Sequence, residues 1–266
     1  MIQGLRSLLK RLGSLRDPKP YTLAEWTERH REVVRRDVER ILPYVPEDGL
    51  FLDVGANVGL FTEAILEQRP NARAILFEPV QLYYDHCMER LGDRANVTIH
   101  RLALSDSDET RSIFKAKHNY GANSVMKEIM FDRRDNAMVR PDTVVEEELI
   151  ECRRLDSFAP EHDISGVDFI KTDTEGFDYA VLGGMLGFLE GCEQLPVILS
   201  ELLEESYHPC WDQQLAAVRK LEALGYEPVD LSNMATVDDI LFVPKGRRVD
   251  ASGKAGGDSP ASGSRA

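Results

Sequence analysis

Residues 51–61, "FLDVGANVGLF", place two glycines and several small or polar residues between two apolar runs. The first run, "GLFLDVG" at 49–55, is typical of a buried strand, and "VGLFTEAILEQR" at 58–69 has helical spacing. Gly55 allows a sharp turn, and Gly59 is expected to let the backbone and a ligand approach closely. The stretch therefore predicts a strand–turn–helix unit whose amides face a bound molecule.

Strands and helices alternate along the rest of the chain. This alternation predicts an α/β fold with a doubly wound, mainly parallel sheet that binds ligands at the carboxyl ends of its strands. The further apolar runs typical of strands are 72–78, 96–104, 167–173, 196–202 and 238–244, and the helical segments between them are 80–92, 177–189 and 211–226, the last closed by Gly225.

Three other segments complete the predicted organisation. Residues 1–48 form an N-terminal helical extension in which Pro43 and Pro46 end the last helix, and residues 49–245 form the α/β domain. Within that domain, residues 107–151 are polar and too long for a simple connection, so we expect a hairpin plus a lid. Residues 246–266 are mostly Gly, Ala, Ser and Pro and are expected to form a disordered tail.

The composition narrows the class of partner and the compartment. The chain has 266 residues and a formal net charge of -14, which disfavours nucleic acid because phosphate binding needs clustered Lys and Arg. Its four cysteines are scattered, which is typical of a reduced, cytoplasmic protein. No apolar run approaches the ~20 residues of a transmembrane span. Leucines in residues 1–16 recur at helical spacing, which suits a membrane-surface helix or, as we favour, a helix packed on its own domain or on a second copy in a homo-oligomer.

Two positions distinguish the ligands that such a turn can serve. Glu78 ends the second strand, about twenty residues downstream, where a carboxylate accepts both hydroxyls of a ribose. Asn57 stands where the G-x-G-x-x-G pattern of nicotinamide enzymes needs a glycine beside the pyrophosphate. S-adenosylmethionine (SAM) has an amino-acid end instead of phosphates, so the spacing favours SAM. A dinucleotide and a turn without a ligand remain as alternatives.

The motifs "DVGANVGLF", "FEP", "ALSD", "GANS", "RRLDSF" and "DFIKTDTEGFDYAVLGG" occur between residues 50 and 244. In this order they resemble the FkbM family of SAM-dependent methyltransferases. The resemblance implies a class I methyltransferase (Rossmann-like) fold and O-methylation of a sugar, a glycosylated metabolite or another small natural product. Family members commonly carry "IKIDVEG", so Thr172 and Thr174 are departures from the pattern.

The resemblance also implies where the cofactor lies. Glu78 binds its ribose, and Asp106 reaches the amine of its adenine. The residues that hold the methionine end are Asp53, Gly55, Asn57 and Gly59, and those that flank the adenine are Ala103 and Leu104.

Charged residues gather at the end of the run 167–173. Lys171, Asp173 and Glu175 alternate, so they are expected to share one face, and Glu201 ends the next strand. We expect Asp173 to act as base or substrate orienter, with Lys171 and Glu201 setting its ionisation and Glu175 contacting the substrate. Two alternatives stay open: a structural Lys171–Glu201 salt bridge with Asp173 capping the next helix, and a divalent cation on Asp173, Glu175 and Glu201, which we do not expect.

The segment "HNYGANS" supplies further polar groups. Tyr120, Asn123 and Ser124, with His118, suit a polyol substrate, although a surface turn is an equal alternative. His208 is a candidate base, but a lone His before Pro is more often structural. The rival functions are a nicotinamide-dependent oxidoreductase, a methyltransferase acting on nitrogen or a carboxylate, and a non-catalytic SAM-binding protein of the same fold.

Overall fold

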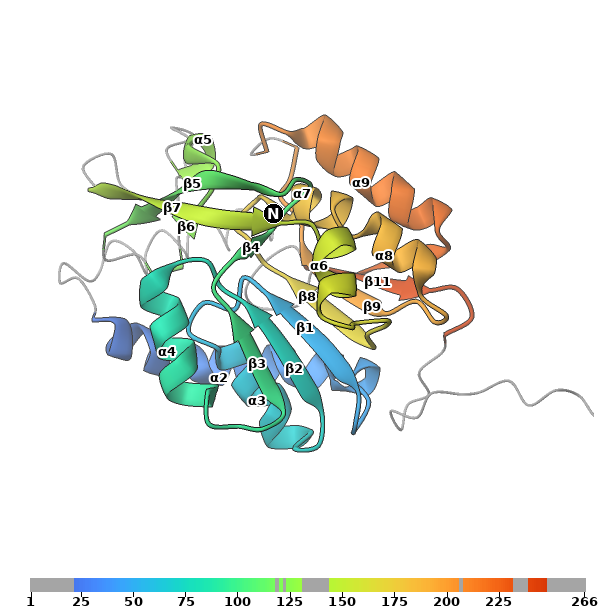
Figure 1. Ribbon diagram of the computed structural model, residues 1–266, viewed down its shortest axis with the longest axis horizontal. Coiled ribbons are helices and arrows are strands. Elements are labelled where there is room, and N and C mark those ends of the chain that lie inside the picture. Colours follow the sequence, from blue (N-terminus) through green and yellow to red (C-terminus); the bar gives the residue numbers. More distant parts are fainter. Residues whose placement is uncertain are drawn as a thin grey trace, which may run out of the picture.

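A computed structural model describes residues 22–117, 120–121, 123–130, 144–205, 208–231 and 239–247. Its centre is a seven-stranded sheet in the order β10-β11-β9-β8-β1-β2-β3 (Figure 1). Its strands are β1 (Leu50–Val54), β2 (Arg73–Phe77), β3 (Val97–His100), β8 (Phe169–Thr172), β9 (Val197–Glu201), β10 (Tyr226–Asp230) and β11 (Asp239–Pro244). Neighbouring strands from β3 to β9 pair in parallel, whereas β11 is antiparallel to β9 and β10. The predicted doubly wound, mainly parallel sheet is confirmed.

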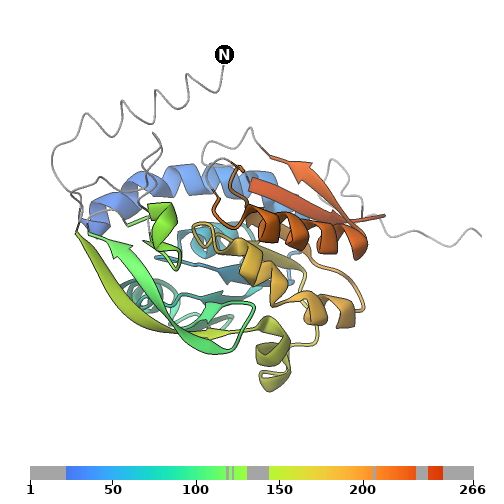
Figure 2. The same cartoon turned by 90° about the horizontal axis from the view of Figure 1, so that it is seen from above.

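Helices cover both faces of this sheet (Figures 1 and 2). One face carries α2 (Leu23–Ile41), α3 (Leu60–Gln68) and α4 (Gln81–Leu91), and the other carries α6 (Leu155–Glu161), α7 (Asp178–Gly183), α8 (Leu186–Gly191) and α9 (Trp211–Ala223). The short helices η1 (Leu42–Tyr44) and α5 (Lys127–Met130) complete the set in the described residues. Among these residues, no helix is both long and apolar enough to cross a bilayer.

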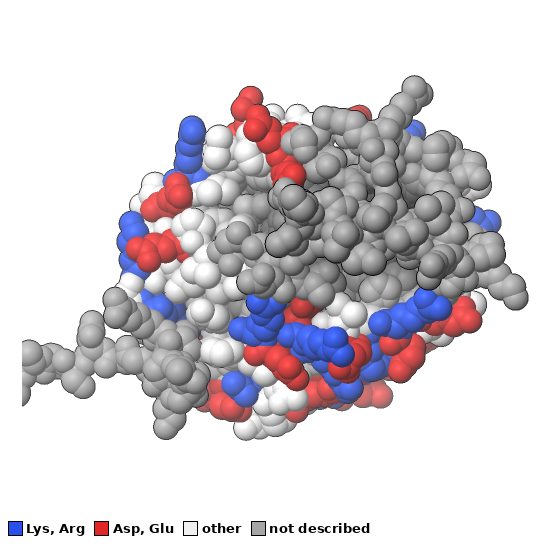
Figure 3. All heavy atoms as spheres, turned by 180° about the vertical axis from the view of Figure 1, so that it is seen from behind, with Lys and Arg blue, Asp and Glu red and all other residues white. Residues whose placement is uncertain are grey.

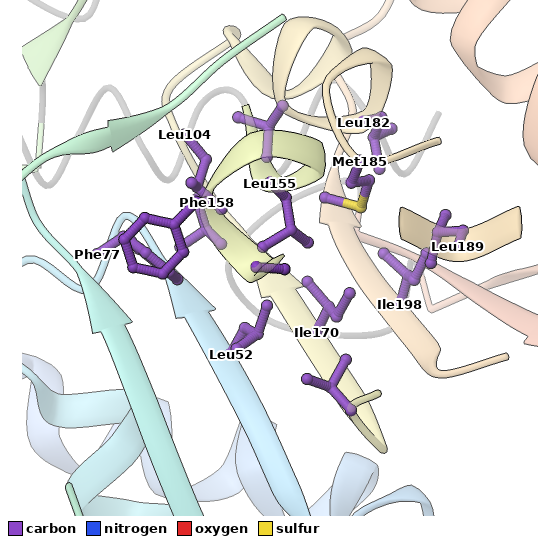
Figure 4. Packing of buried hydrophobic residues seen from close by; sticks show 14 of the residues in the cluster. Leu52, Phe77, Leu104, Leu155, Phe158, Ile170, Leu182, Met185, Leu189 and Ile198 are labelled. Atoms are coloured by element: carbon purple, nitrogen blue, oxygen red, sulfur yellow. The ribbon is translucent and has the colours of Figure 1, made fainter. Parts of the chain in front are cut away.

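The two faces of the sheet bury separate hydrophobic cores. Leu52 and Ile170 pack with Phe158 of α6 and Leu182 of α7 on one face (Figure 4). Phe51, Phe169 and Val197 point the opposite way and pack with Ile41, Ile65 and Leu91 of α2, α3 and α4. Successive residues of a strand alternate between faces, and both faces are dry here. This is why the strands appear in the sequence as unbroken apolar runs.

A second, four-stranded sheet lies beside the carboxyl ends of the main strands (Figure 1). It has the order β4-β7-β5-β6 and consists of β4 (Ala103–Leu104), β5 (Glu109–Ala116), β6 (Asn123–Ser124) and β7 (Val145–Arg153). The β5–β7 antiparallel pair confirms the hairpin expected within 107–151. The prediction of one strand over 96–104 is wrong, because β3 ends at His100 and β4 pairs with β7, about fifty residues away.

Three other elements differ from the sequence-based expectation. The helix predicted over 177–189 is two helices, α7 and α8. It is interrupted at Gly184, whose backbone lies directly against Ser105. Strand β10 contains Pro228, which is tolerated because β10 is an edge strand. Helix α6 begins inside "RRLDSF" (153–158), at Leu155, where no helix was predicted.

Helix α2 belongs to the same core as the α/β domain. A capping box between Thr22 and Glu25 begins it, and Val38 and Ile41 are buried. Its exposed side is tied to α3 by the ion pairs Arg31–Glu63 and Arg35–Glu67. Figure 3 shows basic and acidic side chains next to one another along this side of the molecule. Residues 22–48 thus pack on the α/β domain, whereas residues 1–21, which include the leucines expected to pack on this domain or on a second copy, lie outside the described residues.

We predict that Gly184→Ala lowers the free energy of unfolding by about 2 kcal/mol or more. A Cβ at this position would lie 1.8 Å from the carbonyl oxygen of Ser105, so the loop after β4 would have to move. Gly166→Ala is the matched control, since a Cβ there meets nothing within 4 Å. Urea denaturation of the two variants measures the effect. Equal stability of both would contradict the close packing at Gly184.

Candidate active site

A cavity of about 350 Å³ opens at the carboxyl ends of β1, β2, β8 and β9, and α2 closes one side of it. This volume lies in the range of small-molecule sites, roughly 300–1,000 Å³. Many residues singled out in the sequence line it: Gly55, Asn57, Glu78, Ala103, Leu104, Asn123, Lys171, Asp173, Glu175 and Glu201. The fold therefore brings together residues that lie up to about 150 positions apart in the sequence.

The turn after β1 uses its backbone amides to hold its own shape. The N–H groups of Gly55 and Ala56 both donate to the carbonyl oxygen of Phe77, and the N–H of Asn57 donates to Glu78 Oε2 at 2.8 Å. Gly59 N–H donates to the carbonyl oxygen of Ala56. This differs from the expectation that these amides face the ligand. The turn is a rigid scaffold, and recognition falls to the side chains around it.

The two glycines of the turn serve the backbone. Gly55 has φ +76° and packs so tightly that a Cβ would lie 2.0 Å from the carbonyl oxygen of Asp173. Gly59 has φ +78°, and a Cβ there would meet Leu91 at 2.9 Å. Gly59 therefore allows the close approach of α4, rather than the ligand approach expected from the sequence.

Glu78 occupies the position expected for a ribose ligand. Its Oε1 accepts the N–H of Val80 at 2.9 Å and its Oε2 accepts that of Asn57. Each carboxylate oxygen keeps a second lone pair for a hydroxyl donor. Burial raises the pKa of Glu78 to about 8, and the two backbone hydrogen bonds only partly offset that cost.

Lys171 is the electrostatic centre of the site. Its buried ammonium lies 3.3 Å from Asp53 Oδ1 and 3.6 Å from Asp173 Oδ2, and it donates to the carbonyl oxygen of Gly55 at 2.9 Å. Burial alone would lower the pKa of Lys171, but the attraction of Asp53 and Asp173 outweighs it and raises the pKa. Lys171 is therefore charged. Its ion pairs in the described structure replace the Lys171–Glu201 salt bridge that was one alternative.

Asp53 lies beneath the cavity and not on its wall. Its carboxylate is fully buried, accepts the Thr62 hydroxyl at 2.7 Å and pairs with Lys171. The sequence analysis expected Asp53 to hold the methionine end directly. In this structure Asp53 acts through Lys171 and through helix α3, so it is a positioning residue.

Acidic groups surround the far end of the cavity. Burial, followed by repulsion from Asp173, Glu175 and Asp178, raises the pKa of Glu201 well above its ordinary value. Burial and repulsion from Asp173 likewise raise the pKa of Asp239 to about 8. The side chain of Asp173 itself is about half exposed, at 48%. Asp173 is thus the most exposed of the carboxylates on the cavity wall.

The loop after β8 is fixed by the insert between β5 and β7. Glu175 has φ +54°, and its carbonyl oxygen accepts the Ser124 hydroxyl at 2.8 Å. That hydroxyl also accepts the N–H of Met126, so both of its roles are taken within the protein. Ser124 positions the loop that carries Glu175, whereas the sequence analysis expected it to bind substrate.

Asparagine side chains connect this insert to the turn after β1. The amide nitrogens of Asn57 and Asn123 both donate to the carbonyl oxygen of Tyr120, at 2.8 and 3.3 Å, and Asn123 also donates to the Tyr83 hydroxyl. Both asparagines line the cavity, whereas Tyr120 contributes its backbone from behind them. His118 lies outside the described residues.

Two other candidates lie away from the cavity wall that the described residues form. The Asp106 carboxylate is half exposed, accepts the hydroxyls of Ser105 and Ser107, and lies 3.7 Å from Arg111. His208 is buried, with Nδ1 accepting the N–H of Cys210 and Nε2 donating to the carbonyl oxygen of Gly176. His208 is therefore structural.

The departures from the family pattern have local partners. The Thr172 hydroxyl donates to Ser200 Oγ at 2.8 Å, across the β8–β9 pair. The Thr174 hydroxyl donates to Asp178 Oδ2 at 2.9 Å, as does its N–H. Asp178, and not Asp173, thus caps the loop that leads into α7. Both threonines line the cavity, but their hydroxyls donate to Ser200 and Asp178 within the protein.

Sequence reasoning missed several residues of the cavity wall. Trp26, His30 and Asp37 come from α2, and Asp239 begins β11. The Trp26 and His30 rings stack at 4.1 Å, and Asp37 is buried. The sequence contains one signal for Asp37, since this charged residue directly precedes Val38, an apolar residue that faces the core.

Among the described residues, no group of three or more His, Cys, Asp or Glu side chains is arranged to hold a metal ion. The alternative with a cation on Asp173, Glu175 and Glu201 thus has no preformed site in this part of the chain.

The strand order, with its cavity at the carboxyl ends, is that of a class I methyltransferase. Residues 53–228 match the family described as the methyltransferase FkbM domain, and because this match covers more than half of the chain, the protein belongs to that family.

Individual relatives are distant. The chain is 26% identical over 165 residues to the AMB antimetabolite synthetase AmbE of Pseudomonas aeruginosa, covering 53% of this chain and 8% of the relative. It is 25% identical over 142 residues to the 2-O-methyltransferase NoeI of Sinorhizobium fredii, covering 52% and 57%. A solved methyltransferase FkbM from Methylobacillus flagellatus has 17% identity and a TM-score of 0.47, over 74% of this chain and 44% of that one. The chain thus spans less than two thirds of the length of each.

We predict that the ligand-free protein loses stability as the pH rises from about 6 to about 8. The folded pKa of Glu78 is raised from 4.5 to about 8, so in this window the folded state holds a proton that the unfolded chain has released. Each such group lowers the free energy of unfolding by up to about 1.4 kcal/mol per pH unit. Glu78→Gln should weaken the pH dependence of the free energy of unfolding, which is measured by urea denaturation at each pH.

Glu204→Gln is the control for this experiment, because Glu204 is exposed. Its pH dependence should match that of the unmodified protein. Parallel curves for the unmodified protein and Glu78→Gln would show that Glu78 is ionised throughout.

Proposed function

We propose that this protein transfers a methyl group from SAM to a hydroxyl oxygen of a sugar, a glycosylated metabolite or another small natural product. The observation that carries the proposal is that Glu78 and Asp173 line one cavity. In a protein of the methyltransferase FkbM family, this arrangement supplies a ribose ligand at one end and a reachable carboxylate at the other.

The polar groups of the wall fit SAM better than a dinucleotide. Asn57 Oδ1 and Asn123 Oδ1 are buried acceptors without a hydrogen-bond partner among the described residues, and such atoms are costly unless a ligand donates to them. SAM brings an ammonium, ribose hydroxyls and an adenine amine as donors. A pyrophosphate would need free amides at the turn, where Gly55, Ala56 and Asn57 have already used theirs.

The residues at β8 and β9 suit the deprotonation and orientation of an alcohol. When bound, SAM supplies a methyl group on a positively charged sulfur, so the acceptor oxygen has to be aligned with it and lose its proton. Asp173 is half exposed in the cavity and can accept that proton or orient the hydroxyl. Lys171 is charged and buried, so it holds Asp173 in place instead of acting as a base.

The side chains on the rest of the cavity wall support this class of methyl acceptor. Aromatic rings of Trp26, Phe61 and Tyr83 line the cavity beside carboxylates and Asn123. Rings and hydrogen-bonding groups together suit a hydroxylated ring or chain. The similarity to NoeI, whose name gives it as a 2-O-methyltransferase, supports an oxygen acceptor.

Calorimetric titration with S-adenosylhomocysteine, and with NAD as comparison, tests the cofactor. We expect micromolar binding of S-adenosylhomocysteine alone. Tight binding of NAD instead would favour the oxidoreductase, and binding of neither would favour a protein that keeps the fold without the chemistry.

We predict that Asp173→Asn lowers methyl transfer by about 10²–10⁴-fold while the affinity for S-adenosylhomocysteine stays within about threefold. The amide keeps the size of the side chain but cannot accept the proton of the hydroxyl. Release of S-adenosylhomocysteine in the presence of a pool of hydroxylated glycans measures turnover. Asp212→Asn, at an exposed position of α9, is the control. Full activity of Asp173→Asn would remove Asp173 from the mechanism.

A further inference from the structure

Glu201 at the end of β9 is a buried acid that shares a hydrogen bond with Asp173 and has one oxygen without a partner. Glu201 is 6% exposed and lines the cavity, and its Oε2 has no hydrogen-bond partner among the described residues. A buried carboxyl group in this state costs free energy unless something in the cavity donates to it. Glu201 therefore points to a ligand group that carries hydrogen-bond donors.

Two more acids face the same end of the cavity. Asp239 is the register partner of Glu201 in the antiparallel β9–β11 pair, so the two side chains lie on the same face of the sheet. Asp37 of α2 lines the cavity from the other side and repels Asp239. We call Asp37, Glu201 and Asp239 the acidic end of the cavity.

Acidic side chains outnumber basic ones on the cavity wall that the described residues form. The cavity wall carries six carboxyl groups, Asp37, Glu78, Asp173, Glu175, Glu201 and Asp239, and its one Lys or Arg in the described residues is Lys171. The ammonium of Lys171 is already shared between Asp53 and Asp173. Burial, and then repulsion from Asp173, raises the pKa of both Glu201 and Asp239.

The acidic end is distant from the ribose position. Glu78 follows β2, whereas Glu201 ends β9, and these strands are separated by β1 and β8. With strands about 4.8 Å apart, three spacings amount to about 14 Å. The acidic end lies beyond Asp173 as seen from Glu78, so it is on the side where the methyl acceptor would lie.

We propose that the acidic end binds a protonated amine, and that the acceptor is an amino alcohol or amino sugar. This inference rests on the proposed methyltransferase function, which it makes more specific. An ammonium brings three donors and one positive charge, so it can donate to Glu201 Oε2 and balance one of the two carboxylates, Glu201 or Asp239. A metal ion is the weaker explanation, since no metal-holding group occurs in the described residues.

Matched probes that differ only in this group test the proposal. D-glucosamine is compared with D-glucose, and 2-aminoethanol with ethane-1,2-diol, by ligand-observed NMR titration of the full chain with and without S-adenosylhomocysteine. We expect at least one amine to bind about tenfold more tightly than its neutral counterpart at neutral pH. Asp239→Asn should remove most of this preference and leave the binding of S-adenosylhomocysteine unchanged.

Asp212→Asn on the surface of α9 is the control variant and should keep the preference for the amine. If neither amine binds more tightly than its neutral counterpart, or if Asp239→Asn keeps the full preference, the amine site is wrong. The titration with S-adenosylhomocysteine separates the two proposals. If S-adenosylhomocysteine binds but no amine is preferred, the amine site is wrong and the methyltransferase proposal stands. If an amine is preferred but S-adenosylhomocysteine does not bind, the cavity is an anionic pocket and the methyltransferase proposal fails.

Discussion

The buried ammonium of Lys171 holds the active-site end of the sheet together. It joins Asp53 at the end of β1, Asp173 just after β8 and the carbonyl oxygen of Gly55 in the turn. A buried charge is tolerated only with such partners, and removal of one partner from a buried pair typically costs about 3–5 kcal/mol. Lys171 thus adds a side-chain link between the turn and two central strands that already pair through their backbones.

The rigidity of the turn follows from this arrangement. Lys171, Cys87 and Arg90 donate to the carbonyl oxygens of Gly55, Asn57 and Val58, while the amides of the turn bond within the protein. A turn with its polar groups satisfied has little left to offer a ligand. Under the proposed function, selectivity depends on the side chains that surround the turn, where apolar groups lie beside six carboxyl groups.

The sequence was sufficient for the fold and for much of the cavity because both depend on local signals. Buried parallel strands appear as apolar runs, and Glu78 and Asp173 follow such runs directly. The features that could not be predicted from the sequence depend on contacts between segments that are distant in the chain. Nothing near Asp239 indicates that it faces Glu201, and nothing near Ser124 indicates that its hydroxyl meets the carbonyl oxygen of Glu175. The same reason explains the strand break after His100, since the partner of β4 comes about fifty residues later.

Helix α2 lies outside the family match of residues 53–228, yet it walls the acceptor end of the cavity with Trp26, His30 and Asp37. One cavity is thus built from two parts of the chain: the residues that the family model matches, which include Glu78, and a preceding helix that it does not match. A fragment cut at the boundaries of the match would lose this helix, the first residues of β1 and the whole of β11, so neither the cavity nor the sheet would be complete.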